Sequence, residues 1–158
     1  MAGLCLEGHN PAMGIGQWTN KLQRFWHLRL TDKWLFLCAF YWLGVARIWL
    51  IKVPFPELAE RLSADPGTRK ADPEVLRRVG IAVSAAGGNV PWRSDCFPQA
   101  IAAHKLLRKY GYASTIHLGV DKAGAGDLLA HAWLSCGETI VTGGSEAHRY
   151  AEIHRLGE

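Results

Sequence analysis

In the first half of the chain, apolar residues recur at intervals of three and four at Val75, Leu76, Val79 and Val83, the spacing typical of an amphipathic helix. We expect the first long helix to begin at the N-cap residues Thr31 and Asp32 and to end before the prolines of 53–56. The segment Asp72-Pro73-Glu74 indicates another helix start, because proline fits the first helical position. Helices are therefore predicted over about 32–52, 57–64 and 73–86.

The second half changes from helical spacing to alternation. One more helix is expected over about 95–109, and Gly111 suits the left-handed residue that closes a helix. Beyond it, apolar and polar residues alternate, which indicates strands with one buried face, expected at 112–120, 128–135 and 139–143. Helices followed by one helix packed on an antiparallel meander make an α+β fold.

Length and composition agree with a globular domain. A chain of 158 residues, 49% hydrophobic and 20% charged, can bury a sizeable core. The net charge of +4 comes from scattered Lys and Arg, so nothing indicates a nucleic-acid partner. We expect one compact domain with a loosely ordered segment at 1–30, a helical part at 31–86 and a core at 87–158.

The cysteines do not form a metal-binding or disulfide pattern. No C-x-x-C or H-x-x-x-H pair accompanies Cys5, Cys38, Cys96 and Cys136, so no metal site is expected. Neither "GTRK" nor "GAGD" has the spacing of a phosphate loop, and no cofactor is expected. The first residues lack a basic segment followed by an apolar one, so we expect no secretory signal and a reducing, cytoplasmic setting.

One run, "WLFLCAFYWLGVA" at 34–46, is uncharged and apolar. It is shorter than the roughly 20 residues that span a bilayer, and Arg47 follows it. This length favours a buried or partner-facing helix. Peripheral membrane contact through 34–51 is the alternative, because five of the seven tryptophans lie between Trp18 and Trp49.

The stretch "WRSDCFPQA" contains a candidate nucleophile, Cys96. Ser94 or Asp95 can cap the helix, which places Cys96 in the first turn among unpaired backbone amides. Those amides and the helix dipole stabilise a thiolate, the nucleophilic form. The same helical face carries Ala100, Ala103 and Leu107, so the cysteine should face the sheet. The alternative is a buried structural cysteine.

A thiol nucleophile needs a base, and His131 is the candidate. It stands in the apolar tract "LLAHAWL", where an imidazole is unusual. The alternative is a core histidine whose hydrogen bonds are all satisfied. His104 is eight residues beyond Cys96, or about 12 Å along the helix axis, too far for contact. His117 is expected in the preceding strand. A helix-initiating cysteine and a strand histidine together favour a catalytic pair.

A third group usually orients the imidazole. The next predicted strand, "TIVTGGSE", has neither Asp nor Asn. Thr142, Glu146, Asp127 and a backbone carbonyl all stay open as the orienting group.

These motifs, "WRSDCFPQAIAAHKLLRKYG", then "HLGV", "AHAWL" and "IVTGG", resemble the transglutaminase-like leader peptidases of lasso peptide biosynthesis, of the stand-alone B-protein type. The resemblance covers about 30–155. It implies a papain-like core with Cys96 as nucleophile and His131 as base and acid. It also implies a ribosomally made precursor as substrate, a separate leader-recognition protein and an ATP-dependent lasso cyclase.

The resemblance has one departure from the family pattern. Many family members carry an aspartate about a dozen residues after the histidine, and Gly143 occupies that place here. A Cys-His dyad or a substitute orienting group is therefore expected. The oxyanion donors would be the Cys96 amide and one unassigned group.

Two other functions fit the same residues. The fold can transfer the acyl group to an amine, as transglutaminases do, instead of to water. Alternatively, a non-catalytic module can present its aromatic N-terminal half to a partner or a membrane.

Overall fold

The computed structural model describes residues 29–63, 67–92, 94–121 and 129–157. Within these ranges four α-helices precede a four-stranded antiparallel sheet of order β3-β2-β1-β4, which is the expected α+β class. The helices are α2 (Leu30–Lys52), α3 (Phe55–Ser63), α4 (Pro73–Gly87) and α5 (Cys96–Lys109). The strands are β1 (Thr115–Asp121), β2 (Ala130–Cys136), β3 (Thr139–Thr142) and β4 (Tyr150–Leu156), with the short 3₁₀ helix η1 (Ala147–Arg149) before β4.

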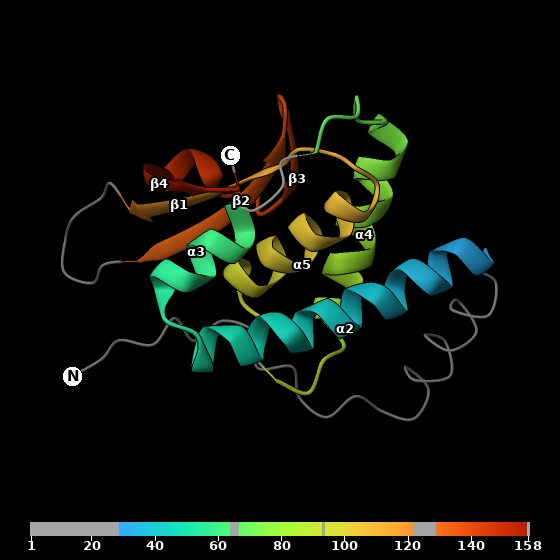
Figure 1. The fold of residues 1–158 in the computed structure, drawn as a ribbon, viewed down its shortest axis with the longest axis horizontal. Coiled ribbons are helices and arrows are strands. Elements are labelled where there is room, and N and C mark those ends of the chain that lie inside the picture. Colours follow the sequence, from blue (N-terminus) through green and yellow to red (C-terminus); the bar gives the residue numbers. More distant parts are fainter. Residues whose placement is uncertain (1–28, 64–66, 93, 122–128, 158) are drawn as a thin grey trace.

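Helix α5 lies at the centre of the structure, between the sheet and α2 (Figure 1). Its small side chains let neighbouring elements approach closely on several sides, and its buried residues include Ala100, Ala102 and Ala103. Helix α4 packs beside it and also contacts β3. The N-terminal end of α5 is therefore held where α4, β2 and β3 come together.

Two helix boundaries follow the expected chemistry. The Asp72 side chain caps α4 by accepting a hydrogen bond from the Glu74 amide at 2.9 Å. Gly111 follows the C-cap of α5 with a φ of +77°, the left-handed conformation expected of it.

The start of α2 differs from the sequence prediction. The N-cap position belongs to Arg29, which makes no side-chain cap bond, and the predicted caps Thr31 and Asp32 already lie within the helix. Both instead accept hydrogen bonds from Arg78 of α4, at 2.9 Å and 2.5 Å. The prediction of their capping role was wrong because a long-range partner claims these side chains.

The strands were predicted less accurately than the helices. Strand β1 begins at Thr115 rather than at residue 112, because Tyr112 forms an isolated bridge with Arg69. Strand β4, which pairs with β1, was not predicted. Most of its residues are exposed at the edge of the sheet, so it lacks the alternation that marks a half-buried strand. The glycine-rich turn expected at 121–127, apart from Asp121, and nearly all of segment 1–30 lie outside the described residues.

Helix α2 is apolar on two opposite faces. Its inner face buries Leu35, Ala39, Leu43 and Ala46 against the other helices. Its outer face exposes large apolar side chains at helical spacing: Leu30, Trp34, Leu37, Tyr41, Ile48 and Ile51. By length and hydropathy alone this 23-residue helix could cross a membrane, a property that core helices also show. The run at 34–46 thus has one face in the core and an opposite face on the surface.

A buried polar network fixes the far half of α5. The Nε2–H of His104 donates to the Leu62 carbonyl at 2.9 Å, so Nδ1 is left to accept from the Ser114 hydroxyl, also at 2.9 Å. Burial, reinforced by the charge of Lys105, lowers the pKa of His104 to about 4. His104 therefore serves as a neutral link between α3, α5 and the segment before β1.

This network predicts a loss of stability in mild acid. The pKa of His104 is near its ordinary value in the unfolded chain and about 4 in the folded protein. Its contribution to the free energy of unfolding is therefore full above about pH 6.5 and falls as the pH drops towards 4. We expect the free energy of unfolding to drop by about 2 kcal/mol between about pH 7.5 and pH 5 through this residue. Urea unfolding of the protein and of His104→Gln at both pH values measures it. An equal drop in the variant would contradict the assignment.

Candidate active site

Cys96 is the first residue of α5, as its position in the sequence predicted. Asp95 holds the N-cap place with extended backbone but makes no side-chain cap bond, and the Ser94 hydroxyl is buried without a hydrogen-bond partner in the described part of the chain. The predicted cap is thus wrong although the helix start is right. Instead, the Gln99 side chain donates through Nε2 to the Ser94 carbonyl at 2.8 Å and holds the turn together.

The Cys96 sulfur lies against the backbone of β2. The Ala132 amide donates a hydrogen bond to Sγ over 3.3 Å. Strand β3 ends at Thr142, which pairs with Leu134, so the amide of Ala132 lies beyond the last β3 pair and is open to the cysteine. An N–H donor aimed at sulfur stabilises the thiolate, because hydrogen bonds to a charged acceptor are stronger than those to a neutral one.

His131, the residue before Ala132, is oriented by a backbone carbonyl. Its Nε2 lies 2.8 Å from the oxygen of Gly143. A carbonyl can only accept, so Nε2 carries the hydrogen and Nδ1 is the basic nitrogen of the neutral ring. Of the groups left open by the sequence, the one that orients His131 is thus a backbone carbonyl. It belongs to Gly143, the position at which lasso leader peptidases often have an aspartate.

Glycine is required at position 143 for two structural reasons. Its φ of +75° lies in the left-handed region, which L side chains rarely adopt. A Cβ there would lie 2.7 Å from the Ala132 carbonyl oxygen and 2.9 Å from Cβ of Trp133. An aspartate would therefore not fit, and the main chain takes over its role.

The other candidates for this role do not contact His131 through any hydrogen bond in the described residues. Glu146 pairs with Arg149 at 3.9 Å. The Thr142 hydroxyl is buried and has no hydrogen-bond partner in the described ranges. Asp127 lies outside the described residues.

A row of aromatic rings supports the histidine. The His131 ring stacks on Tyr150 at 4.9 Å and on Trp133 at 6.1 Å between centroids, and Trp133 in turn stacks on His117 at 5.3 Å. Gly119 makes room for these rings, since a Cβ there would lie 2.9 Å from the Trp133 ring and 3.0 Å from Cβ of Tyr150. Burial and the nearby Glu146 carboxylate raise the pKa of Tyr150, so its hydroxyl stays neutral at physiological pH.

This stacking predicts that Tyr150 acts through its ring and not through its hydroxyl. Tyr150→Phe keeps the ring, and we expect less than about a twofold change in kcat. Tyr150→Ala frees one face of His131, and we expect about a tenfold fall in kcat from the looser imidazole. Steady-state kinetics of both variants provides the measurement. A Phe variant as impaired as the Ala variant would assign the role to the hydroxyl instead.

Cys96 and His131 line one cavity of about 390 Å³, together with Gln99, Gly143 and residues of α4 and β3. The β1 histidine, His117, is bonded to Ser135 and Glu152 and does not line this cavity. In the described ranges no group of three or more His, Cys, Asp or Glu could hold a metal ion.

Sequence reasoning missed three supporting groups and left a fourth, the orienting carbonyl, without a residue. The Ala132 amide and the Gly143 carbonyl are main-chain groups, which a sequence does not mark. Gln99 could have been found, because it lies one helical turn after Cys96 on nearly the same face. Tyr150 stands in the strand that was not predicted, so no signal pointed to its ring.

A cysteine at a helix N-terminus beside an oriented histidine on a neighbouring strand is the arrangement of thiol-dependent acyl-transfer enzymes. The family comparison agrees with this class. A model of the transglutaminase-like superfamily matches residues 41–155, and the chain belongs to that superfamily, which includes cysteine proteases. The comparisons with curated proteins and with solved structures returned no match.

Proposed function

We propose that the protein is a cysteine endopeptidase that removes the leader from a ribosomally made lasso peptide precursor. The observation that carries the chemistry is the Cys96–His131 cavity, in which the Gly143 carbonyl fixes the histidine tautomer. The leader specificity rests on the resemblance of the motifs around both residues to lasso leader peptidases. Membership in the transglutaminase-like superfamily supports the thiol mechanism but is broader than this substrate.

The proposed reaction uses His131 twice in each half. Nδ1 takes the Cys96 proton, and the thiolate attacks the scissile carbonyl carbon. The imidazolium then protonates the leaving amine as the C–N bond breaks, which leaves a thioester on Cys96. His131 next takes a proton from water, and the hydroxide attacks the thioester. As the C–S bond breaks, the imidazolium returns its proton to the Cys96 sulfur, which restores the thiol, and the released acid ionises to the carboxylate.

Two donors are available for the developing oxyanion. The Cys96 amide lies at the start of α5, where backbone N–H groups lack intrahelical partners. We assign the second to Gln99, which lines the cavity and has a second Nε2 hydrogen beyond the one donated to Ser94.

The proposal includes partners that the resemblance implies. The substrate is the precursor peptide, a separate protein binds its leader, and a lasso cyclase uses the product in the cytoplasm. The exposed apolar face of α2, from Leu30 to Ile51, is the surface we assign to the leader-recognition protein. Peripheral lipid contact is the competing assignment for that face.

The product of the reaction distinguishes hydrolysis from acyl transfer. We expect the protein, mixed with a precursor peptide and its leader-recognition protein, to release a leader that ends in a free carboxylate. Mass spectrometry of the released leader makes the measurement, with a primary amine such as glycine ethyl ester present in excess. A leader recovered mainly as the amide would support the transglutaminase-type reaction, and no thiol-dependent product would support the non-catalytic module.

A further inference from the structure

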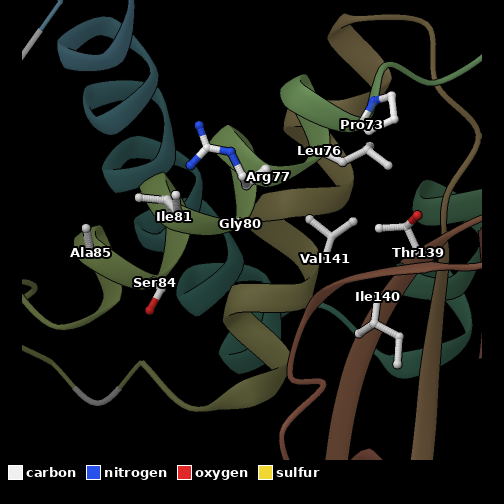
Figure 2. A pocket seen from close by; sticks show the side chains of 10 residues that line it. All are labelled: Pro73, Leu76, Arg77, Gly80, Ile81, Ser84, Ala85, Thr139, Ile140 and Val141. Atoms are coloured by element: carbon white, nitrogen blue, oxygen red, sulfur yellow. The ribbon is translucent and has the colours of Figure 1, made fainter.

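A second, larger cavity lies beside the candidate active site. It measures about 620 Å³ and runs between α4 and β3 (Figure 2). Figure 2 shows Leu76, Gly80 and Ser84 on α4 across from Val141 on β3. Its lining is largely apolar: Pro73, Leu76, Ile81, Ala85, Ile140 and Val141.

This groove is continuous with the Cys96–His131 cavity. Gly80, Ser84 and Val141 line both. The two walls meet closely at Gly80, where a Cβ would lie 2.6 Å from the Val141 carbonyl oxygen. The groove therefore opens into the active-site cavity past a glycine that keeps α4 and β3 in contact.

One feature of the groove and one of the adjoining active-site cavity indicate a bound peptide. Ile81 and Ile140 line it and leave 56% and 47% of their surface exposed, although covering large apolar residues is favourable. Thr142, the residue after Val141, lines the adjoining active-site cavity, and its buried hydroxyl has no hydrogen-bond partner in the described ranges. Buried polar groups are rarely left unpaired, and a peptide N–H or C=O in the cavity would pair with this one.

We infer that the α4–β3 groove binds an apolar side chain of the substrate peptide on the acyl side of the scissile bond. This inference rests on the proposed function and names the substrate feature that the same site selects. His131 protonates the leaving amine, so the leaving side of the peptide lies over His131. The acyl side then extends the other way, past Gly80 and Ser84, where the groove opens.

Peptidyl acyloxymethyl ketones test the groove, because they alkylate a cysteine from the acyl side. The probes are acetyl-Leu-Leu-Gly and acetyl-Ser-Ser-Gly acyloxymethyl ketones, with iodoacetamide as the probe of the thiol alone. We expect the leucine probe to label Cys96 about tenfold faster than the serine probe. Ile140→Ser should reduce that preference to below about threefold, with an unchanged iodoacetamide rate. The matched control is Ile153→Ser, an exposed isoleucine of β4 at the opposite edge of the sheet, which should keep the full preference.

Each outcome bears on one of the two proposals. Three results would overturn the groove assignment, provided that iodoacetamide still modifies Cys96. They are equal labelling by both peptidyl probes, no labelling by either peptidyl probe, and a leucine preference that survives Ile140→Ser. A Cys96 that reacts with none of the three probes would contradict the proposed function, and the groove assignment with it.

Discussion

Cys96→Ala is expected to abolish leader cleavage, with a loss of roughly 10⁴-fold or more in kcat. The variant removes the sulfur that accepts the Ala132 amide bond and that forms the proposed thioester. His131→Ala should lose as much, because nucleophile and base act as one unit and their losses do not add. Time courses of precursor cleavage, followed by mass spectrometry, measure both variants and their combination.

The matched control for this prediction is Cys38→Ala. Cys38 is another free, partly buried cysteine, in α2, and it does not line the cavity of Cys96. We expect it to cleave at the normal rate, and all variants to melt within a few degrees of the parent. Cleavage by Cys96→Ala, or an equal loss in Cys38→Ala, would refute the assignment of the nucleophile.

Gly143→Ala is expected to produce the second largest effect, about a 100-fold fall in kcat. The new Cβ would lie 2.7 Å from the Ala132 carbonyl oxygen, so the turn must move and carry the Gly143 carbonyl away from His131. The imidazole would then lose both its orientation and the bond that selects its tautomer. Steady-state kinetics gives the rate, and thermal unfolding gives the cost in stability.

Gly137→Ala separates the two consequences of this substitution. Gly137 has a φ of +58°, so alanine there meets a similar left-handed strain, but no heavy atom lies within 4 Å of its Cβ position. We expect it to lose stability without a comparable loss of kcat. Equal rates in the two variants would mean that the Gly143 carbonyl does not position His131.

The sequence predicted the helices well because their signals are local. Proline, a capping aspartate and a closing glycine placed α4 and the end of α5 within a residue or two. The expected caps and the prolines placed the first long helix over about 32–52, but its start at Leu30 was missed, because Thr31 and Asp32 are bonded to Arg78, 47 and 46 residues away. Long-range partners of that kind carry no local sequence signal.

The same reason limits what the sequence says about the site. Cys96 and His131 were found because a helix-initiating cysteine and a histidine in an apolar strand are unusual side chains in unusual places. The groups around them are main-chain atoms, such as the Gly143 carbonyl, or belong to β4, whose exposed edge hides its pattern. Glycine at 143 looked like a missing orienting residue, whereas its φ and tight surroundings are what bring the carbonyl to His131.

The most direct test of the account is the detection of the thioester on Cys96. The protein is mixed with a precursor peptide and its leader-recognition protein, quenched in acid within the first turnover, digested and examined by mass spectrometry. The account predicts that the peptide containing Cys96 carries the added mass of the leader acyl group, and that the adduct is lost on treatment with hydroxylamine. Leader cleavage with no acyl mass on Cys96, or with that mass on another residue, would contradict it.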